Sequence, residues 1–145
     1  MKNRGDEIVA RARSLLGTAY RPKGRSEEGV DCVGLAAFAL SIPAAAVPKA
    51  YERRKGCPSL IAVALDALGF DVRDGSDTAP GVLLIFDVGL GRIHLGISTG
   101  AAFVHADAGL GRVVERPFPP PWPVAAVWRV LKSAEQDRAS WQPSS

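Results

Sequence analysis

The hydrophobic period of the sequence changes about halfway along the chain, and this change decides the class of fold. After Gly69 the chain consists of short segments rich in β-branched and aromatic residues, separated by Gly or Pro: PGVLLIFDVG, RIHLGIS, AFVHAD, RVVERPF and VAAVWRV. Such segments predict strands, and their close spacing predicts an antiparallel meander. Because these strands follow helices rather than alternate with them, we expect an α+β domain.

The first half of the chain has helical patterning. Residues 6–16 place apolar side chains on one stripe and are followed by Gly17, which predicts an amphipathic helix. A second helix is expected to begin at residue 31 or 32 and to run to about residue 40. Its apolar residues surround the axis, so other elements should enclose it. The segment PSLIAVALDALGF predicts a third helix over residues 59–68.

Length and composition are those of one globular domain. The chain has 145 residues, of which 47% are hydrophobic and 23% charged. We expect a single domain over residues 1–131 and a loose polar tail over 132–145. No apolar run reaches the roughly 20 residues of a membrane helix, and the N-terminus is amphipathic rather than a signal peptide. We therefore expect synthesis in the cytoplasm and no association with a membrane.

The charge limits the classes of binding partner, and the cysteine count excludes a disulfide scaffold. The formal charge is +3 with a pI near 9.1, which suits an anionic partner such as nucleic acid or cell wall. The basic residues are scattered and no aromatic residues are interleaved among them, so we expect a solvated basic surface and no nucleic-acid site. Two cysteines, Cys32 and Cys57, are too few for a disulfide scaffold.

The two histidines of the chain, His94 and His105, lie in neighbouring predicted strands joined by STGAA. A hairpin centred on Thr99 and Gly100 makes His94 directly opposite His105, so that both imidazoles share one face of the sheet. The apolar residues between them then point to the other face, towards the core. A slip of one residue would put the imidazoles on opposite faces.

Cys32 stands at the start of the second predicted helix, where it is either inert packing or a nucleophile. Unpaired N–H groups at a helix N-terminus favour the thiolate and lower the thiol pKa, and an adjacent imidazole can take the proton. Cys32, His94 and His105 thus supply a nucleophile, a base and a group that orients the base. Asp31 opposes thiolate formation if it lies close, but as an N-cap it would direct its oxygens to helix N–H groups.

The motifs LLGTAYRPKG, DCVGL, RIHLGIS and FVHADAG, in this order, resemble those of the NlpC/p60 cell-wall cysteine peptidases. The likeness spans roughly residues 5–130. The short length and the C-terminal VVERPFPPPWPVAAVWRV resemble the single-domain branch found in phages, prophages and gene-transfer particles. Three departures are Val33 where a small polar residue is usual, Val82 where an aspartate follows Pro-Gly, and KGR in place of Gly-Gly.

This resemblance implies a papain-like fold, with helices packed on an antiparallel sheet, and hydrolysis of peptide-stem bonds in peptidoglycan. The typical bond joins γ-D-glutamate to a diamino acid. On this pattern Cys32 is the nucleophile, His94 the general base and His105 the third, orienting residue. Tyr20 matches a tyrosine that assists the oxyanion, and Asp31 matches an acidic residue that holds the stem peptide at a free amine.

Other functions stay open at this point. The same fold without turnover would be a structural component of a phage-like tail or a cell-wall-binding module. Cys32, His94 and His105, with Asp107, are chemically acceptable zinc ligands, although their spacing matches no zinc motif. The triad also fixes the acyl-thioester but not its acceptor, so an acyltransferase is compatible with it. On the peptidase hypothesis no metal or other cofactor is needed, and the absence of an export signal fits a protein carried by a virion tail to the cell wall in the periplasm.

Overall fold

The computed structural model describes residues 4–26, 28–42, 70–73, 77–90 and 92–130. The third expected helix, Cys57 and the polar tail lie outside the described residues. Within the described part, no helix is both long and apolar enough to cross a membrane.

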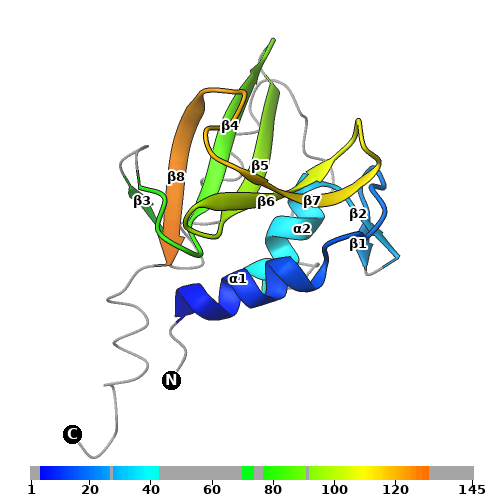
Figure 1. Ribbon diagram of the computed structural model, residues 1–145, viewed down its shortest axis with the longest axis horizontal. Coiled ribbons are helices and arrows are strands. Elements are labelled where there is room, and N and C mark those ends of the chain that lie inside the picture. Colours follow the sequence, from blue (N-terminus) through cyan, green and yellow to red (C-terminus); the bar gives the residue numbers. More distant parts are fainter. Residues whose placement is uncertain (1–3, 27, 43–69, 74–76, 91, 131–145) are drawn as a thin grey trace, which may run out of the picture.

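Two helices confirm the patterning of the first half. Helix α1 (Arg4–Ser14) buries Ile8, Val9 and Ala12 along one side, and Gly17, with a φ of 88°, lies beyond its C-terminus. Helix α2 (Cys32–Ala39) begins one residue after its N-cap, Asp31, and is buried nearly all round. The two helices pack against each other, and α2 lies over strands β5 (Arg92–Ser98) and β6 (Ala102–Asp107) (Figure 1).

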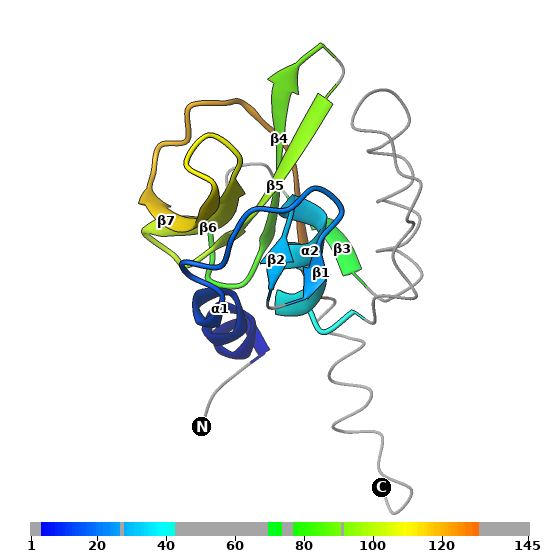
Figure 2. The same ribbon diagram turned by 90° about the vertical axis from the view of Figure 1, so that its right-hand side faces the viewer.

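Among the described residues, six strands form one antiparallel sheet with the order β3-β8-β4-β5-β6-β7. Strands β4 (Leu83–Gly89), β5 (Arg92–Ser98), β6 (Ala102–Asp107) and β7 (Arg112–Pro117) make the expected meander. Strand β8 (Val124–Val130) then returns to pair with β4, and it also pairs with β3 (Phe70–Arg73), a strand that the sequence patterning did not predict. A separate two-stranded ribbon, β1 (Arg25–Ser26) and β2 (Gly29–Val30), lies beside α2 (Figure 2).

The sheet is buried on both faces. One face packs against α1 and α2 and includes Leu83, Leu95, Ile97 and Val104. The other face carries a smaller cluster around Phe86 and Phe103, which the Pro-rich segment 118–123 covers with Phe118 and Trp122. Alternating residues of β5 therefore meet two different environments, as the period of a strand requires.

The β5–β6 hairpin has a register two residues away from the expected one. Ile97 pairs with Val104 and Ser98 with Phe103, so the loop is centred on residues 100 and 101. Gly100 has a φ of 108°, and a glycine with positive φ is favoured at the first central position of a type II′ hairpin. The predicted direct pairing of His94 with His105 is therefore wrong. Because the slip is by an even number, the two histidines still share a face.

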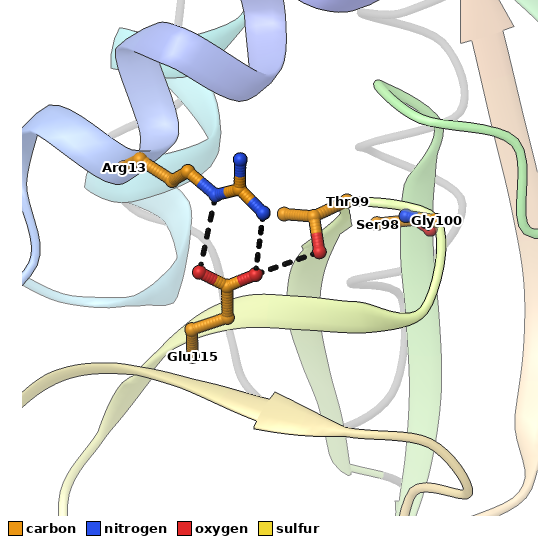
Figure 3. A network of polar contacts seen from close by, with 5 residues as sticks. All are labelled: Arg13, Ser98, Thr99, Gly100 and Glu115. Carbon is orange, nitrogen blue, oxygen red and sulfur yellow. Dashed lines mark hydrogen bonds and ion pairs between the residues drawn. The ribbon is translucent and has the colours of Figure 1, made fainter.

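An ion pair ties α1 to the sheet next to the turn of the β5–β6 hairpin. The Arg13 guanidinium donates to both carboxylate oxygens of Glu115 on β7, at 3.1 and 3.0 Å, and the Thr99 hydroxyl donates to one of them at 2.8 Å (Figure 3). These bonds hold the pKa of Glu115 below its usual value, with the Arg13 hydrogen bond as the largest cause. The contact joins three elements that are distant in sequence.

Candidate active site

The N-terminus of α2 is fixed by Asp31. Its Oδ1 accepts the N–H of Gly34 at 2.8 Å, and its Oδ2 accepts the N–H of Lys23 at 2.8 Å. The first bond confirms the predicted N-cap, and the second attaches the loop before β1 to the helix. Asp31 is 1% exposed. The carboxylate thus sets the position of Cys32, the first residue of α2.

Gly34 lets the same loop approach the helix. A Cβ atom at Gly34 would overlap the carbonyl oxygen of Gly24, so only glycine permits this contact. The loop also presents Tyr20, whose N–H donates to the Gly111 carbonyl at 2.9 Å and which forms a bridge with Val30. Asp31 and Gly34 of the DCVGL motif therefore attach this loop to the start of α2. The loop carries Tyr20, and the helix begins with Cys32.

The two histidines form a direct hydrogen bond. His94 Nε2 and His105 Nδ1 are 2.9 Å apart, and the two rings meet edge to face at an interplanar angle of 85°. The paired residues of β5 and β6 lie near the turn of the hairpin, and β6 then crosses the direction of β5 (Figure 1). The bond between the imidazoles spans the place where the described strands diverge.

Gly96 gives the aromatic residues next to the imidazoles their space. A Cβ atom there would lie 3.2 Å from the rings of Phe86 and Phe103. The ring centroids of Phe86 and His94 are 6.2 Å apart, and those of Phe103 and His105 are 5.1 Å apart. Both imidazoles therefore pack against apolar aromatic rings.

His105 is 1% exposed. Burial lowers the pKa of His105, while Asp107 acts to raise it and Arg116 to lower it. The net effect favours the neutral imidazole, which is the form that an orienting group needs when it accepts a hydrogen bond.

Cys32, His94, His105 and Tyr20 all line one pocket of about 240 Å³. The structure thus brings together a thiol at the start of α2, an imidazole on β5 and an imidazole on β6. Asp31 is not among the lining residues, and its carboxylate is engaged with backbone N–H groups. These two hydrogen bonds position the helix.

Two further residues of the pocket were not selected from the sequence. The ring of Trp122 lies 5.2 Å from that of His94 and 5.8 Å from that of His105, and Arg92 contributes a cation to the lining. A lone tryptophan inside PFPPPWP was the available indication for the first. Nothing in the pattern around Arg92 distinguished it from the scattered basic residues.

The geometry of the described residues does not favour the zinc hypothesis. Among the residues that the structure describes, no group of three or more His, Cys, Asp or Glu side chains has an arrangement that could hold a metal ion. The donors that the sequence suggested for zinc instead make a hydrogen-bonded histidine pair beside a cysteine.

Comparison with known proteins gives the fold. Neither a protein-family model nor a curated protein matches the sequence. Among solved structures, the NlpC/p60 domain of the peptidoglycan hydrolase SagA matches with a TM-score of 0.61 and 21% identity over 87% of this chain and 98% of that one. NlpC1 from Trichomonas vaginalis matches with a TM-score of 0.62 and 19% identity over 89% of this chain.

The matches differ in extent and in activity. The chain spans about half the length of two of the matched structures, 46% of NlpC1 and 49% of NlpC2 from Trichomonas vaginalis. RipD from Mycobacterium tuberculosis, described as a non-catalytic NlpC/p60 domain protein adapted to peptidoglycan binding, matches with a TM-score of 0.58 and 16% identity over 90% of this chain and all of that one. The protein therefore has the α+β, papain-like fold of NlpC/p60 domains, a fold that serves both peptidoglycan hydrolases and a non-catalytic relative.

Proposed function

We propose that this protein is a cysteine peptidase that hydrolyses peptide-stem amide bonds of peptidoglycan, with the bond between γ-D-glutamate and a diamino acid as the expected target. The observation that carries the proposal is the presence of Cys32, His94 and His105 in one pocket. The Nε2 atom of His94 lies 2.9 Å from the Nδ1 atom of His105. The likeness in fold to peptidoglycan hydrolases supports the substrate class.

In the proposed reaction the Cys32 thiol transfers its proton to Nδ1 of His94, and the thiolate attacks the amide carbonyl. The N-terminus of α2 favours both the thiolate and the oxyanion that forms beside it, and Tyr20 lies in the same pocket. His94 then gives the proton to the leaving amine, which departs and leaves a thioester. Water, deprotonated by His94, cleaves the thioester and restores the thiol.

His105 acts on His94 rather than on the substrate. Its Nδ1 accepts a hydrogen bond from His94 Nε2, which fixes the orientation of the imidazole and stabilises the imidazolium that forms during the reaction. The logic is that of the third member of other catalytic triads. His105 is suited to this role because it is buried and its pKa is lowered.

The second candidate is a catalytically idle module that binds the cell wall or belongs to a phage-like tail. The match to non-catalytic RipD favours this candidate. The histidine pair in a shared pocket with Cys32 favours the peptidase, because wall binding alone does not need a nucleophile and an oriented base in one place.

Digestion of defined muropeptides by the wild type and by Cys32→Ala distinguishes the two candidates. Cys57→Ser serves as the matched cysteine control. In ¹⁸O-labelled water, mass spectrometry should find the label in the new glutamyl carboxylate with the wild type and Cys57→Ser, and no cleavage with Cys32→Ala. Cleavage by Cys32→Ala, or none by any of the three, would refute the peptidase; transfer of the acyl group to an added amine would identify an acyltransferase.

We also propose delivery to the wall by a phage-like tail, with tail proteins as partners. The sequence resemblance to the phage and gene-transfer branch is what supports this proposal. Detection of the protein in purified particles by mass spectrometry tests it, and its absence from particles that are otherwise complete would count against it.

A further inference from the structure

The second ring nitrogen of His105 is buried without a hydrogen-bond partner among the described residues. The negatively charged group near this atom is the carboxylate of Asp107, whose Oδ2 lies 3.9 Å from His105 Nε2. That distance is too long for a hydrogen bond but short enough for an electrostatic interaction with the buried imidazole.

The carboxylate of Asp107 is held in place by the β6–β7 turn. Its Oδ1 accepts the N–H of Leu110 at 3.0 Å, and the Asp107 carbonyl accepts the N–H of Gly111 at 2.8 Å. With one oxygen bound to the turn, the other is the one nearer His105. The side chain also lines the pocket and is 22% exposed.

The position of the proton on His105 decides whether His94 can act as a base. If His94 donates from Nε2, His105 accepts at Nδ1 and must carry its own proton on Nε2, facing the carboxylate. If the bond is reversed, His105 turns a lone pair towards the carboxylate, and neutral His94 carries its proton on Nδ1. In that second state neither ring nitrogen of His94 can accept the proton of Cys32.

We propose that Asp107 is a positioning residue that selects the Nε2–H tautomer of His105 and thereby keeps Nδ1 of His94 available to the thiol. The inference rests on the thiol–imidazole chemistry of the proposed function and extends it from three side chains to four. Asp107 transfers no proton in this scheme; its negative charge favours an N–H over a lone pair at the facing atom and stabilises the imidazolium of His94 through His105.

The other groups around His105 agree with this assignment. His94 on β5 forms a hydrogen bond with it, and Asp107 on β6 lies 3.9 Å from its Nε2. The charge of Arg116 on β7 opposes a positive charge on His105. Segment 118–123 contributes Trp122, which is not titratable. Since burial and Arg116 both favour neutral His105, Asp107 acts on the choice of tautomer and not by protonating the ring.

The test is Asp107→Asn, which keeps an oxygen for the Leu110 N–H but replaces the facing charge. The matched control is Asp87→Asn in the β4–β5 hairpin. Asp87 makes the same kind of turn bond there, because its carboxylate accepts the N–H of Gly89 at 2.9 Å. The chain has two histidines, so nitrogen-15 NMR can read the tautomer of each. We expect Nε2–H on His105 in the wild type and in Asp87→Asn, and a mixture with Nδ1–H in Asp107→Asn.

Kinetics give the second arm of the test. In Asp107→Asn, kcat on a muropeptide should fall about tenfold to a hundredfold with KM unchanged. This loss is smaller than that from replacing a carboxylate in direct contact with a catalytic histidine. The upper limb of the pH profile should move to lower pH, because the imidazolium of His94 loses a stabilising charge. A wild-type tautomer and a wild-type pH profile in Asp107→Asn would overturn the proposal.

The two arms separate failure of this inference from failure of the proposed function. If the wild type cleaves no muropeptide, the peptidase proposal fails, whereas the NMR arm still reads the effect of Asp107 on His105. If the wild type cleaves muropeptides and His105 carries its proton on Nδ1, the peptidase stands and the role of Asp107 is refuted.

Discussion

Replacement of Asp31 by alanine distinguishes a residue that positions the nucleophile helix from one that binds substrate. The change removes the acceptors of two backbone N–H groups, those of Gly34 and Lys23, each at 2.8 Å. Loss of the N-cap costs about 1 kcal/mol, and loss of the second, partly buried bond to a charged acceptor costs about 1 to 2 kcal/mol. The sum is about 2 to 3 kcal/mol, equivalent to a fall in Tm of about 7 to 10 °C for a chain of this length.

Urea denaturation followed by circular dichroism measures this loss in the free energy of unfolding. Asp31→Asn keeps one carboxylate-like oxygen and should lose about half as much. Asp87→Ala is the control, because its single turn bond is exposed and should be worth under about 1 kcal/mol. If Asp31→Ala is as stable as Asp87→Ala while KM rises, the positioning argument is wrong and the role at the substrate amine is favoured.

Two further predictions concern the attachment of α1. Because the pKa of Glu115 is lowered in the folded state, its pair with Arg13 stabilises the protein above the unfolded-state pKa, near 4.5, and this contribution is lost as the pH falls through the folded-state value. Glu115→Gln should remove that part of the pH dependence. The contribution to the free energy of unfolding should be under about 1 kcal/mol, because the pair is partly exposed. An unchanged curve of stability against pH would contradict this prediction. Gly81 has a φ of 95°, and a Cβ atom there would lie 2.6 Å from the Cα of Gly5. Gly81→Ala should therefore lose about 1 to 3 kcal/mol in urea unfolding, and more than Gly17→Ala, whose φ of 88° meets no crowding; equal losses would show that the contact with α1 has no cost.

The strands and the shared face of the histidines could be predicted because both follow from a period of two. Val, Ile and Phe at alternating positions mark the strand segments, and any register that buries Leu95, Ile97 and Val104 together also brings His94 and His105 to the other face. The cap at Asp31 was predictable for a similar reason, since it depends on the backbone of residues 31–34 alone. Local chemistry was sufficient for these features.

Features that depend on distant packing could not be predicted. The loop centre of the β5–β6 hairpin moved by one position because Gly100 takes the first central place of the turn, and the pattern of apolar residues is the same in both registers. The return of β8 to β4 is a choice among sheet edges that alternation does not reveal. The sequence suggested Asp107 only as a zinc ligand, because its position beside the buried nitrogen of His105 depends on the folded turn.

The central claim, that His94 activates Cys32, is tested most directly by the pH dependence of Cys32 alkylation with iodoacetamide. The measurement uses a Cys57→Ser background, so that a single thiol reports, and compares it with the same protein carrying His94→Ala. We predict that the parent reacts rapidly near pH 6, well below the ordinary thiol pKa of about 8.5, whereas His94→Ala reacts at comparable rates only as the pH approaches that value. Identical profiles for the two proteins would contradict the account.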